Sequence, residues 1–296
     1  MDTILFRNKK TKFASGFFII LLIIIGAAYW GYNLLQKSVA ERFLRIADDE
    51  FYQSIMAVNR LSTKELIKYD KNLDALIERI NDEKEKVSST LKVIDKARNF
   101  QNGVKPTIHV EASHILLKYY YKVATDTVNN YADYISYRIK IISEIKTIND
   151  SVGKITNSET ACRDVDINNT TRCITGVKKL VNDSLYRVKE TLIPKGMDEF
   201  EASFGQYTKF ITENCDKLVK LSQSGQNSEY EAIIRILREN LPEYPDTLIT
   251  LDAAYFNQLH DDFLKLKESA LMVQAELEKA GSNLDIFIMK LPPLEW

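Results

Sequence analysis

The chain has 296 residues, and its 40 basic and 41 acidic side chains leave a formal net charge of −1. Acids and bases are interspersed, whereas a nucleic-acid-binding surface needs clustered Lys and Arg, so we expect no nucleic acid among its partners. Only ten glycines and six prolines are present, which argues against a β-rich chain with many turns and favours an all-α protein.

The N-terminal region begins with a basic arm, residues 1–12, followed by an uncharged and largely apolar segment, residues 13–36. The arm holds four basic residues and one acid. The apolar segment is long enough to cross a bilayer as a helix, which takes about 20 residues. Because positive charge beside a span stays on the cytoplasmic side, we predict a cytoplasmic arm and a single transmembrane helix. Residues 37–296 are then expected in the periplasm or outside the cell.

The apolar segment has two interpretations, a retained signal anchor or a cleaved signal peptide. Gly26, Ala27 and Ala28 have the small side chains of a cleavage site. The apolar character continues past Ala28 to Leu35, which is longer than the core of a signal peptide needs to be. We therefore expect an anchor that remains in the chain. Since no second segment of spanning length follows, any signal is expected to pass through a partner protein.

Residues 37–61 are expected to continue the helix of the span, since no Gly or Pro occurs between Gly31 and Gly103. Ser62 and Glu65 have the spacing of a capping box, which either restarts a helix or lies within one. From there apolar side chains recur at every seventh position, as in a coiled coil. They are Leu66, Leu73, Ile80, Val87 and Ile94.

The companion positions of this heptad are weaker, because Glu83 and Thr90 occupy two of them. Leu91 at a further position indicates an apolar face wider than a coiled-coil seam. We therefore predict a long amphipathic helix in an elongated antiparallel helical bundle, with a coiled-coil-like first half. The heptad spacing also leaves a homo-oligomer open.

A second long helix is predicted over residues 111–149, and it is rich in tyrosine. These side chains are candidates for a ligand-binding or partner-binding surface, because each combines an aromatic ring with a hydroxyl group. The commoner role of Tyr is packing at the edges of helix interfaces, and that interpretation stays open. The candidates are Tyr119, Tyr120, Tyr131 and Tyr134.

The most polar region, residues 149–175, contains Cys162 and Cys173. Outside the cytoplasm cysteines oxidise readily, so we predict a disulfide between them, which restricts the unfolded chain. Cys215 remains within a later helix. It is expected either to be buried as a small apolar side chain or to form an intermolecular bridge.

The remainder of the chain is predicted to form further helices separated by Gly and Pro. The apolar tail from Leu284 to Leu291 is too short to span a bilayer, so it either packs back onto the bundle or lies at the membrane surface. The expected helices cover residues 176–192, 197–221, 230–241 and 251–279.

Motifs that would indicate an enzyme or a metal site are incomplete. Asp164, Asp166 and Asn168 resemble the start of a calcium loop, but the required Gly and Glu are missing. Glu111 and His114 have the spacing of a di-iron ligand pair, which needs a second copy that the sequence does not contain. No nucleophile elbow or phosphate-binding loop occurs. We therefore expect no enzyme activity, cofactor or metal site.

These patterns favour a membrane-anchored helical protein that acts as a structural or protein-interaction component of a cell-envelope assembly. The alternative is a sensor-like ectodomain that binds a ligand through its tyrosine-rich helix and signals through a partner. The expected partners are the membrane, other envelope proteins and, in a homo-oligomer, a second copy of the chain.

Overall fold

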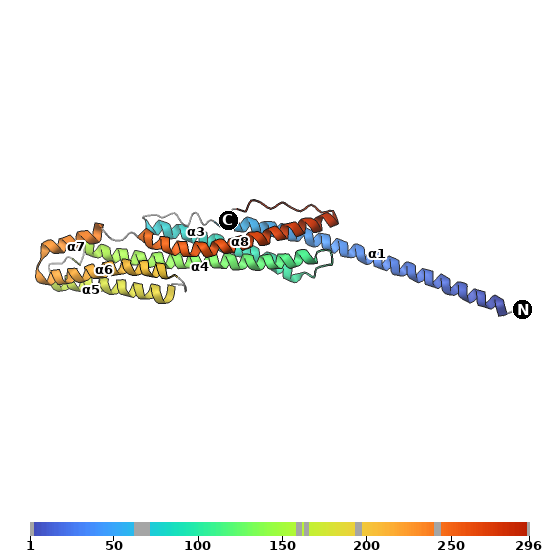
Figure 1. The fold of residues 1–296 in the computed structure, drawn as a ribbon, viewed down its shortest axis with the longest axis horizontal. Helices are drawn as coiled ribbons and strands as arrows, with labels where there is room; N and C mark the ends of the chain where they lie inside the picture. The colour runs from blue at the N-terminus through green and yellow to red at the C-terminus, as the bar shows by residue number, and fades with distance from the viewer. Residues whose placement is uncertain are drawn as a thin grey trace. The chain divides into compact units, whose positions relative to one another are not determined.

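The chain is all-helical within the residues that the computed structural model describes, which are 3–61, 72–157, 162, 166–192, 197–239 and 244–294. These ranges form seven α-helices and one short π-helix, η2, and contain no β-strand (Figure 1). The all-α fold class expected from the composition is confirmed. The elements are α1 (Thr3–Val58), α3 (Leu73–Gly103), α4 (Glu111–Thr156), α5 (Ile167–Arg187), η2 (Val188–Leu192), α6 (Asp198–Ser224), α7 (Asn227–Glu239) and α8 (Tyr244–Leu284).

The N-terminal helix α1 is uninterrupted, so the apolar segment continues into the following residues as predicted, as far as Val58. The expected capping box, from Ser62 to Glu65, and the first heptad position, Leu66, lie outside the described residues. The tyrosine-rich helix α4 begins at the predicted residue and extends beyond its expected end to Thr156.

Helix α5 begins at Ile167, well before the start predicted from the sequence at residue 176. The cause is Asp166, whose side chain accepts a hydrogen bond of 2.8 Å from the backbone amide of Asn168 and so caps the helix. The same Asp166 is part of the incomplete calcium loop noted above, of which Asp164 lies outside the described residues. A polar run that resembles a loop therefore begins a helix.

The chain divides into two compact units. The described residues within 1–58, 92–125 and 266–295 form unit 1, and those within 59–91 and 126–265 form unit 2. Helices α3, α4 and α8 each contribute residues to both units. The two units are described separately below.

In unit 1, α3 runs antiparallel to α1. The ring of Phe100 in α3 stacks on the ring of Phe43 in α1, with centroids 6.0 Å apart. One helical turn earlier in α3, Lys96 forms an ion pair of 2.8 Å with Glu50, which lies later in α1. The turn that follows α3, residues 104–110, therefore lies beyond Phe43, toward the N-terminal half of α1 (Figure 1).

Helix α4 runs parallel to α1 in unit 1, and aromatic rings fill the space between them. Near its start, the ring of His114 lies 5.8 Å from that of Phe43. Further along both helices, Tyr120 meets Phe51 edge to face at 4.9 Å, and its hydroxyl group shares a hydrogen bond of 3.1 Å with Ser54. Burial of such rings contributes on the order of 2 kcal/mol each to the stability of unit 1.

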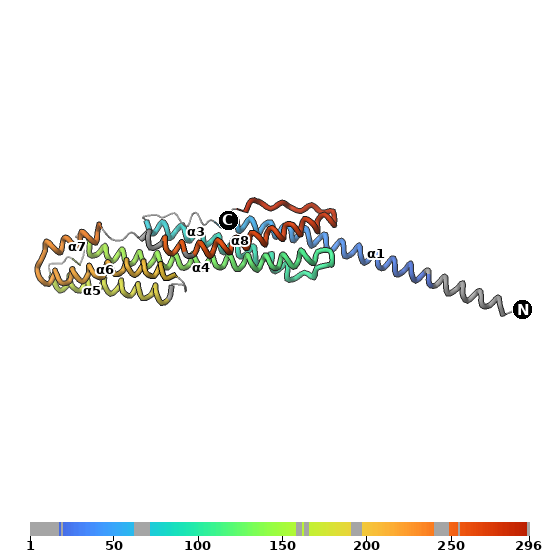
Figure 2. The backbone as a smooth tube through the Cα atoms, in the orientation of Figure 1, coloured from blue at the N-terminus to red at the C-terminus, as the bar shows by residue number. Residues whose placement is uncertain are grey.

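The tail after α8, residues 285–294, turns back at the end of that helix (Figures 1 and 2). Its side chains alternate, because Ile286 and Ile288 are buried while Phe287 between them is exposed. Gly281 permits the close approach of the tail, since a Cβ atom there would lie only 2.6 Å from Cγ1 of Ile288. The tail therefore packs back onto its own unit, which is one of the two expected placements.

Two polar contacts hold this tail through Met289. Its backbone amide donates a hydrogen bond of 3.0 Å to the carboxylate of Asp48 in α1. Its carbonyl oxygen accepts a hydrogen bond of 2.9 Å from Gln274 in α8. Burial raises the pKa of Asp48 above its usual range, and the amide of Met289 partly offsets this effect.

In unit 2, α3 is antiparallel to α4, because Asp74 binds Lys146 while Glu83, later in α3, binds Tyr131, earlier in α4. Helix α4 is likewise antiparallel to α8. Among the helices at higher residue numbers, α5 packs against α6 and α6 against α7 (Figure 2).

In unit 2, the burial of side chains along α3 follows the predicted heptad only in part. Ile80 is buried, as predicted. The companion side chains of Glu83 and Thr90 are also buried, although their polarity led us to predict a wider apolar face that includes Leu91. Leu91 is only half-buried. Glu83 tolerates this environment because it has hydrogen-bonding partners on both of its oxygens.

Candidate functional site

A cluster of buried charged and phenolic side chains lies between α3, α4 and α8 in unit 2. We call these five residues the charge cluster. All of them are buried, which is rare for charged side chains unless they are paired. The members are Glu83, Tyr131, Tyr134, Arg138 and Asp252.

Asp252 is the centre of one half of the charge cluster. One carboxylate oxygen accepts a hydrogen bond of 2.6 Å from the hydroxyl group of Tyr134. The other accepts a hydrogen bond of 3.1 Å from the guanidinium group of Arg138, whose side chain is 0% exposed. Two residues one helical turn apart on α4 thus hold a single residue of α8, which fixes the axial register of the two helices.

Glu83 is the centre of the other half. It accepts a hydrogen bond of 3.2 Å from the hydroxyl group of Tyr131 and forms an ion pair of 2.8 Å with Lys86. Lys86 is about half exposed, so this ion pair joins a buried carboxylate to an ammonium group at the surface. Each carboxylate in the cluster therefore has a basic partner and a phenol donor.

Both phenols in the cluster remain protonated at physiological pH. Burial is the main cause that raises the pKa of Tyr131 and of Tyr134, and the carboxylate beside each ring raises it further. A phenol in this state donates a hydrogen bond and does not transfer its proton. Buried and paired in this way, the cluster is suited to holding the helices in register.

The four tyrosines predicted as a ligand or partner surface are not together at the surface. Tyr120, Tyr131 and Tyr134 are fully buried and hydrogen-bonded. Tyr119 alone among the four is exposed, to 50%. The reason is helical periodicity, since residues 120, 131 and 134 share the core-facing stripe of α4 whereas residue 119 faces away. Three of these side chains therefore pack the core.

Tyr119 has an apolar neighbour on the same face of α4. Ile115 precedes it by one helical turn and is also exposed. This pair, which we call the α4 surface pair, belongs to unit 1. The two side chains form a small exposed apolar area on unit 1.

The predicted cysteine pair is present. The sulfur atoms of Cys162 and Cys173 lie at bonding distance, 1.91 Å. Tyr230 of α7 donates a hydrogen bond of 3.2 Å to the carbonyl oxygen of Cys162, which ties the disulfide to a third helix. Cys215 is buried, and burial raises the pKa of its thiol to about 12. A buried, protonated thiol is inert, so the structure favours the first of the two roles predicted for it.

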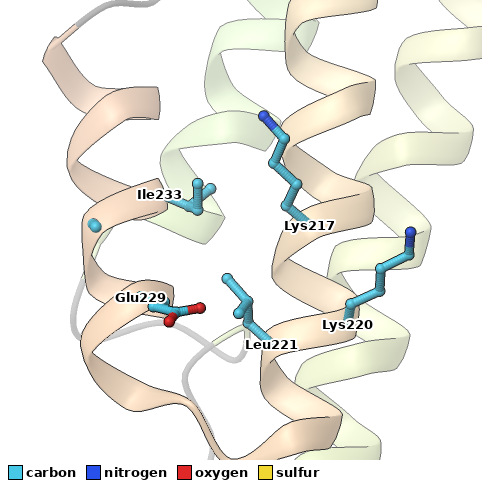
Figure 3. A pocket seen from close by; sticks show the side chains of 6 residues that line it. Lys217, Lys220, Leu221, Glu229 and Ile233 are labelled. Carbon is cyan, nitrogen blue, oxygen red and sulfur yellow. The ribbon is translucent and has the colours of Figure 1, made fainter.

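A shallow groove of about 420 Å³ lies between α6 and α7 (Figure 3). Leu221 and Ile233 form its apolar part, and Lys217, Lys220 and Glu229 lie around them (Figure 3). All three charged side chains are exposed to solvent. A groove that fixes ligand orientation has polar groups placed inside it, so this one is better suited to nonspecific contact than to selective binding.

The histidines lie in different surroundings. His114 of the predicted di-iron pair is buried and bonds the carbonyl oxygen of Gln101 at 2.8 Å, whereas Glu111 is exposed. His260 is exposed as well. Among the residues that the structure describes, no three His, Cys, Asp or Glu side chains are arranged to hold a metal ion.

Comparisons with protein-family models, with curated proteins and with solved structures found no match for this chain. Its function has to be argued from its own features. Three of them carry chemical meaning: the long exposed apolar part of α1, the charge cluster, and the α4 surface pair.

Proposed function

We propose that the protein is a single-pass membrane protein and that its helical bundle, residues 37–296, lies outside the cytoplasm. There it acts as a structural or protein-interaction component of a cell-envelope assembly. In this proposal the helices form an elongated antiparallel bundle on a membrane anchor. The observation that carries it is the change in burial along α1.

The N-terminal half of α1 has the length and apolar composition to cross a membrane. The large apolar side chains that the structure describes between Phe18 and Val39 are exposed, whereas Ala40 and the core-facing residues after it are buried in unit 1. An exposed apolar helix of this length needs a covering, and lipid provides it. The same helix is thus an apolar rod at one end and a core helix at the other.

This continuity also favours a retained anchor over a cleaved signal peptide. Cleavage after Ala28 would leave the rest of α1 with exposed Tyr29, Trp30 and Leu35 and with nothing to cover them. In a retained anchor, these side chains lie at the membrane surface, where aromatic rings are favoured.

A topology experiment tests the anchor. The full chain should stay in the membrane pellet after extraction at alkaline pH, which releases peripheral proteins. A membrane-impermeant thiol reagent should label an Asp49→Cys variant in intact cells, because Asp49 is exposed and follows the span. It should leave a Lys10→Cys variant unlabelled until the membrane is permeabilised. Release by alkaline extraction would contradict the proposal.

The α4 surface pair offers the test of the protein-interaction role. A tagged full chain, cross-linked in its membranes before solubilisation, should recover a specific partner. The double variant Ile115→Ser/Tyr119→Ser should lose that partner, because it removes exposed apolar area without touching the core. The matched control is Leu264→Ser, at a leucine of unit 2 that is 45% exposed. Recovery of no specific partner by the unaltered chain would count against the role itself.

A further inference from the structure

Two large apolar side chains outside the candidate span are more exposed than the large apolar side chains described within it. They are Ile108 and Phe287, which are 81% and 83% exposed, compared with 69% for Trp30. Ile108 lies in the turn between α3 and α4, and Phe287 lies in the tail after α8. Exposure of a large apolar side chain to this degree costs free energy in water, and contact with an apolar partner would recover it.

The turn that carries Ile108 lies at the end of the helical core of unit 1 that is nearer to the apolar, N-terminal half of α1. Phe43 contacts both Phe100, near the end of α3, and His114, near the start of α4. At 1.5 Å per residue, Phe43 is about 10 Å from residue 36, where the span ends. Since α3 runs antiparallel to α1, the turn itself extends closer to the span than Phe43 does.

Phe287 lies near the same end. The backbone amide of Met289 is bound by Asp48 of α1. The tail folds back from the end of α8 and runs away from the N-terminal half of α1 (Figures 1 and 2). Phe287 precedes Met289 by two extended residues, about 7 Å nearer the span. Measured along the axis of α1, Phe287 therefore lies roughly 10 Å from residue 36, somewhat farther than Ile108.

We propose that this end of unit 1 rests on the membrane, with Ile108 and Phe287 inserted into the interfacial layer beside the anchor. The proposal rests on the anchor proposed above. We assign lipid as the partner of these two side chains because they belong to the same unit as the span. Their positions along α1 also place them near the headgroup layer. The contact fixes the orientation of unit 1 on the bilayer, which a single helix leaves free.

The contact is apolar and not electrostatic. Charged residues of both signs occur at this end of unit 1, among them Lys37, Arg42, Glu41 and Glu111. A surface of mixed charge has little net attraction to anionic lipid, so insertion depends on apolar area.

Quenching of tryptophan fluorescence by brominated lipid measures the depth of each side chain. The full chain has two tryptophans, Trp30 and Trp296. With both replaced by Phe, single tryptophans are introduced by Ile108→Trp, Phe287→Trp and, as the matched control, Leu271→Trp. Leu271 is an exposed leucine of unit 1, but it lies about 20 Å before the end of α8, farther from the span. All three positions are exposed, and the helix content from circular dichroism should not change.

In vesicles of brominated phosphatidylcholine, the Ile108→Trp variant should show a blue-shifted emission and strong quenching. The Phe287→Trp variant should be quenched less, and the Leu271→Trp variant should not be quenched. High salt should leave these results unchanged. Quenching that disappears in high salt would show an electrostatic contact and overturn the proposal.

A chain that retains only Trp30 separates this proposal from the anchor. If Trp30 is quenched but the Ile108→Trp variant is quenched no more than the Leu271→Trp variant, the anchor stands and the second contact is wrong. If Trp30 itself is not quenched, the anchor is wrong, and the contact that depends on it is wrong as well.

Discussion

Each of the two units is stabilised internally by a different kind of contact. In unit 1, Phe43, Phe51 and Tyr120 pack as neutral rings, and the carboxylate of Asp48 is bound by a backbone amide. In unit 2, charged side chains are paired in the interior, and a disulfide links the chain at Cys162. Ring packing tolerates small shifts between helices, whereas paired charges permit one alignment. Unit 2 is therefore the more sensitive to the loss of a single group.

The largest expected effect is the loss of Asp252 from the charge cluster. Asp252→Ala should destabilise the full chain in detergent by about 3–5 kcal/mol, because it leaves the charge of Arg138 buried without its carboxylate. Urea unfolding followed by circular dichroism measures the change. Lys209→Ala, which breaks the exposed pair with Glu213, is the control and should cost at most about 0.5 kcal/mol.

A double variant separates a buried charge from lost packing in this experiment. Arg138→Met/Asp252→Leu removes both charges and keeps apolar volume, so it should recover much of the loss. If the double variant is as unstable as Asp252→Ala, the charge cluster does not act through electrostatic pairing.

The disulfide should have the next largest effect in unit 2. Replacing Cys162 and Cys173 together with Ser should lower the free energy of unfolding by about 3 kcal/mol, because the closed loop no longer restricts the unfolded chain. Cys215→Ala is the control, and it should behave differently in thiol assays only after unfolding, since Cys215 is buried. Equal unfolding midpoints with and without reductant in the unaltered chain would contradict this prediction.

A matched pair of tyrosines compares the two units directly. Tyr134→Phe in unit 2 removes a hydrogen bond to a carboxylate and should cost about 1.5–3 kcal/mol. Tyr120→Phe in unit 1 removes a hydrogen bond to the neutral hydroxyl group of Ser54 and should cost about 0.5–1.5 kcal/mol. The same urea experiment measures both, and an equal or reversed order would contradict the contrast between the units.

The smallest effect concerns pH. Glu144 accepts two hydrogen bonds of 2.8 Å from Arg187, and these lower the pKa of its carboxyl group below the ordinary value of 4.5. A lowered pKa stabilises the folded state above pH 4.5, and that stability is lost as the pH falls through the folded-state value. Arg187→Met should therefore reduce the steepness of acid unfolding, whereas an unchanged acid limb would show that the pair contributes nothing.

The sequence predicts the helices well and the interior less well. The long span-to-core helix, the tyrosine-rich helix and the cysteine pair all follow from local pattern, because periodicity and spacing are local properties. The early start of α5 was missed because residues 149–175 are polar and resemble a loop, although Asp166 caps a helix there. The role of Glu83 was missed because its partner Tyr131 lies 48 residues away in the sequence. Long-range pairing of polar groups is not visible in a pattern of apolar residues.

Because α1 passes without a break from Phe18 through Ala40, its exposed apolar half and the half that packs in the core of unit 1 share one helical phase. One residue added between them would advance unit 1 by 1.5 Å and turn it by about 100° around the helix axis. Four added residues would return nearly the same face. In the proposed membrane topology, the number of residues in this junction therefore determines which side of unit 1 faces a given direction in the plane of the membrane.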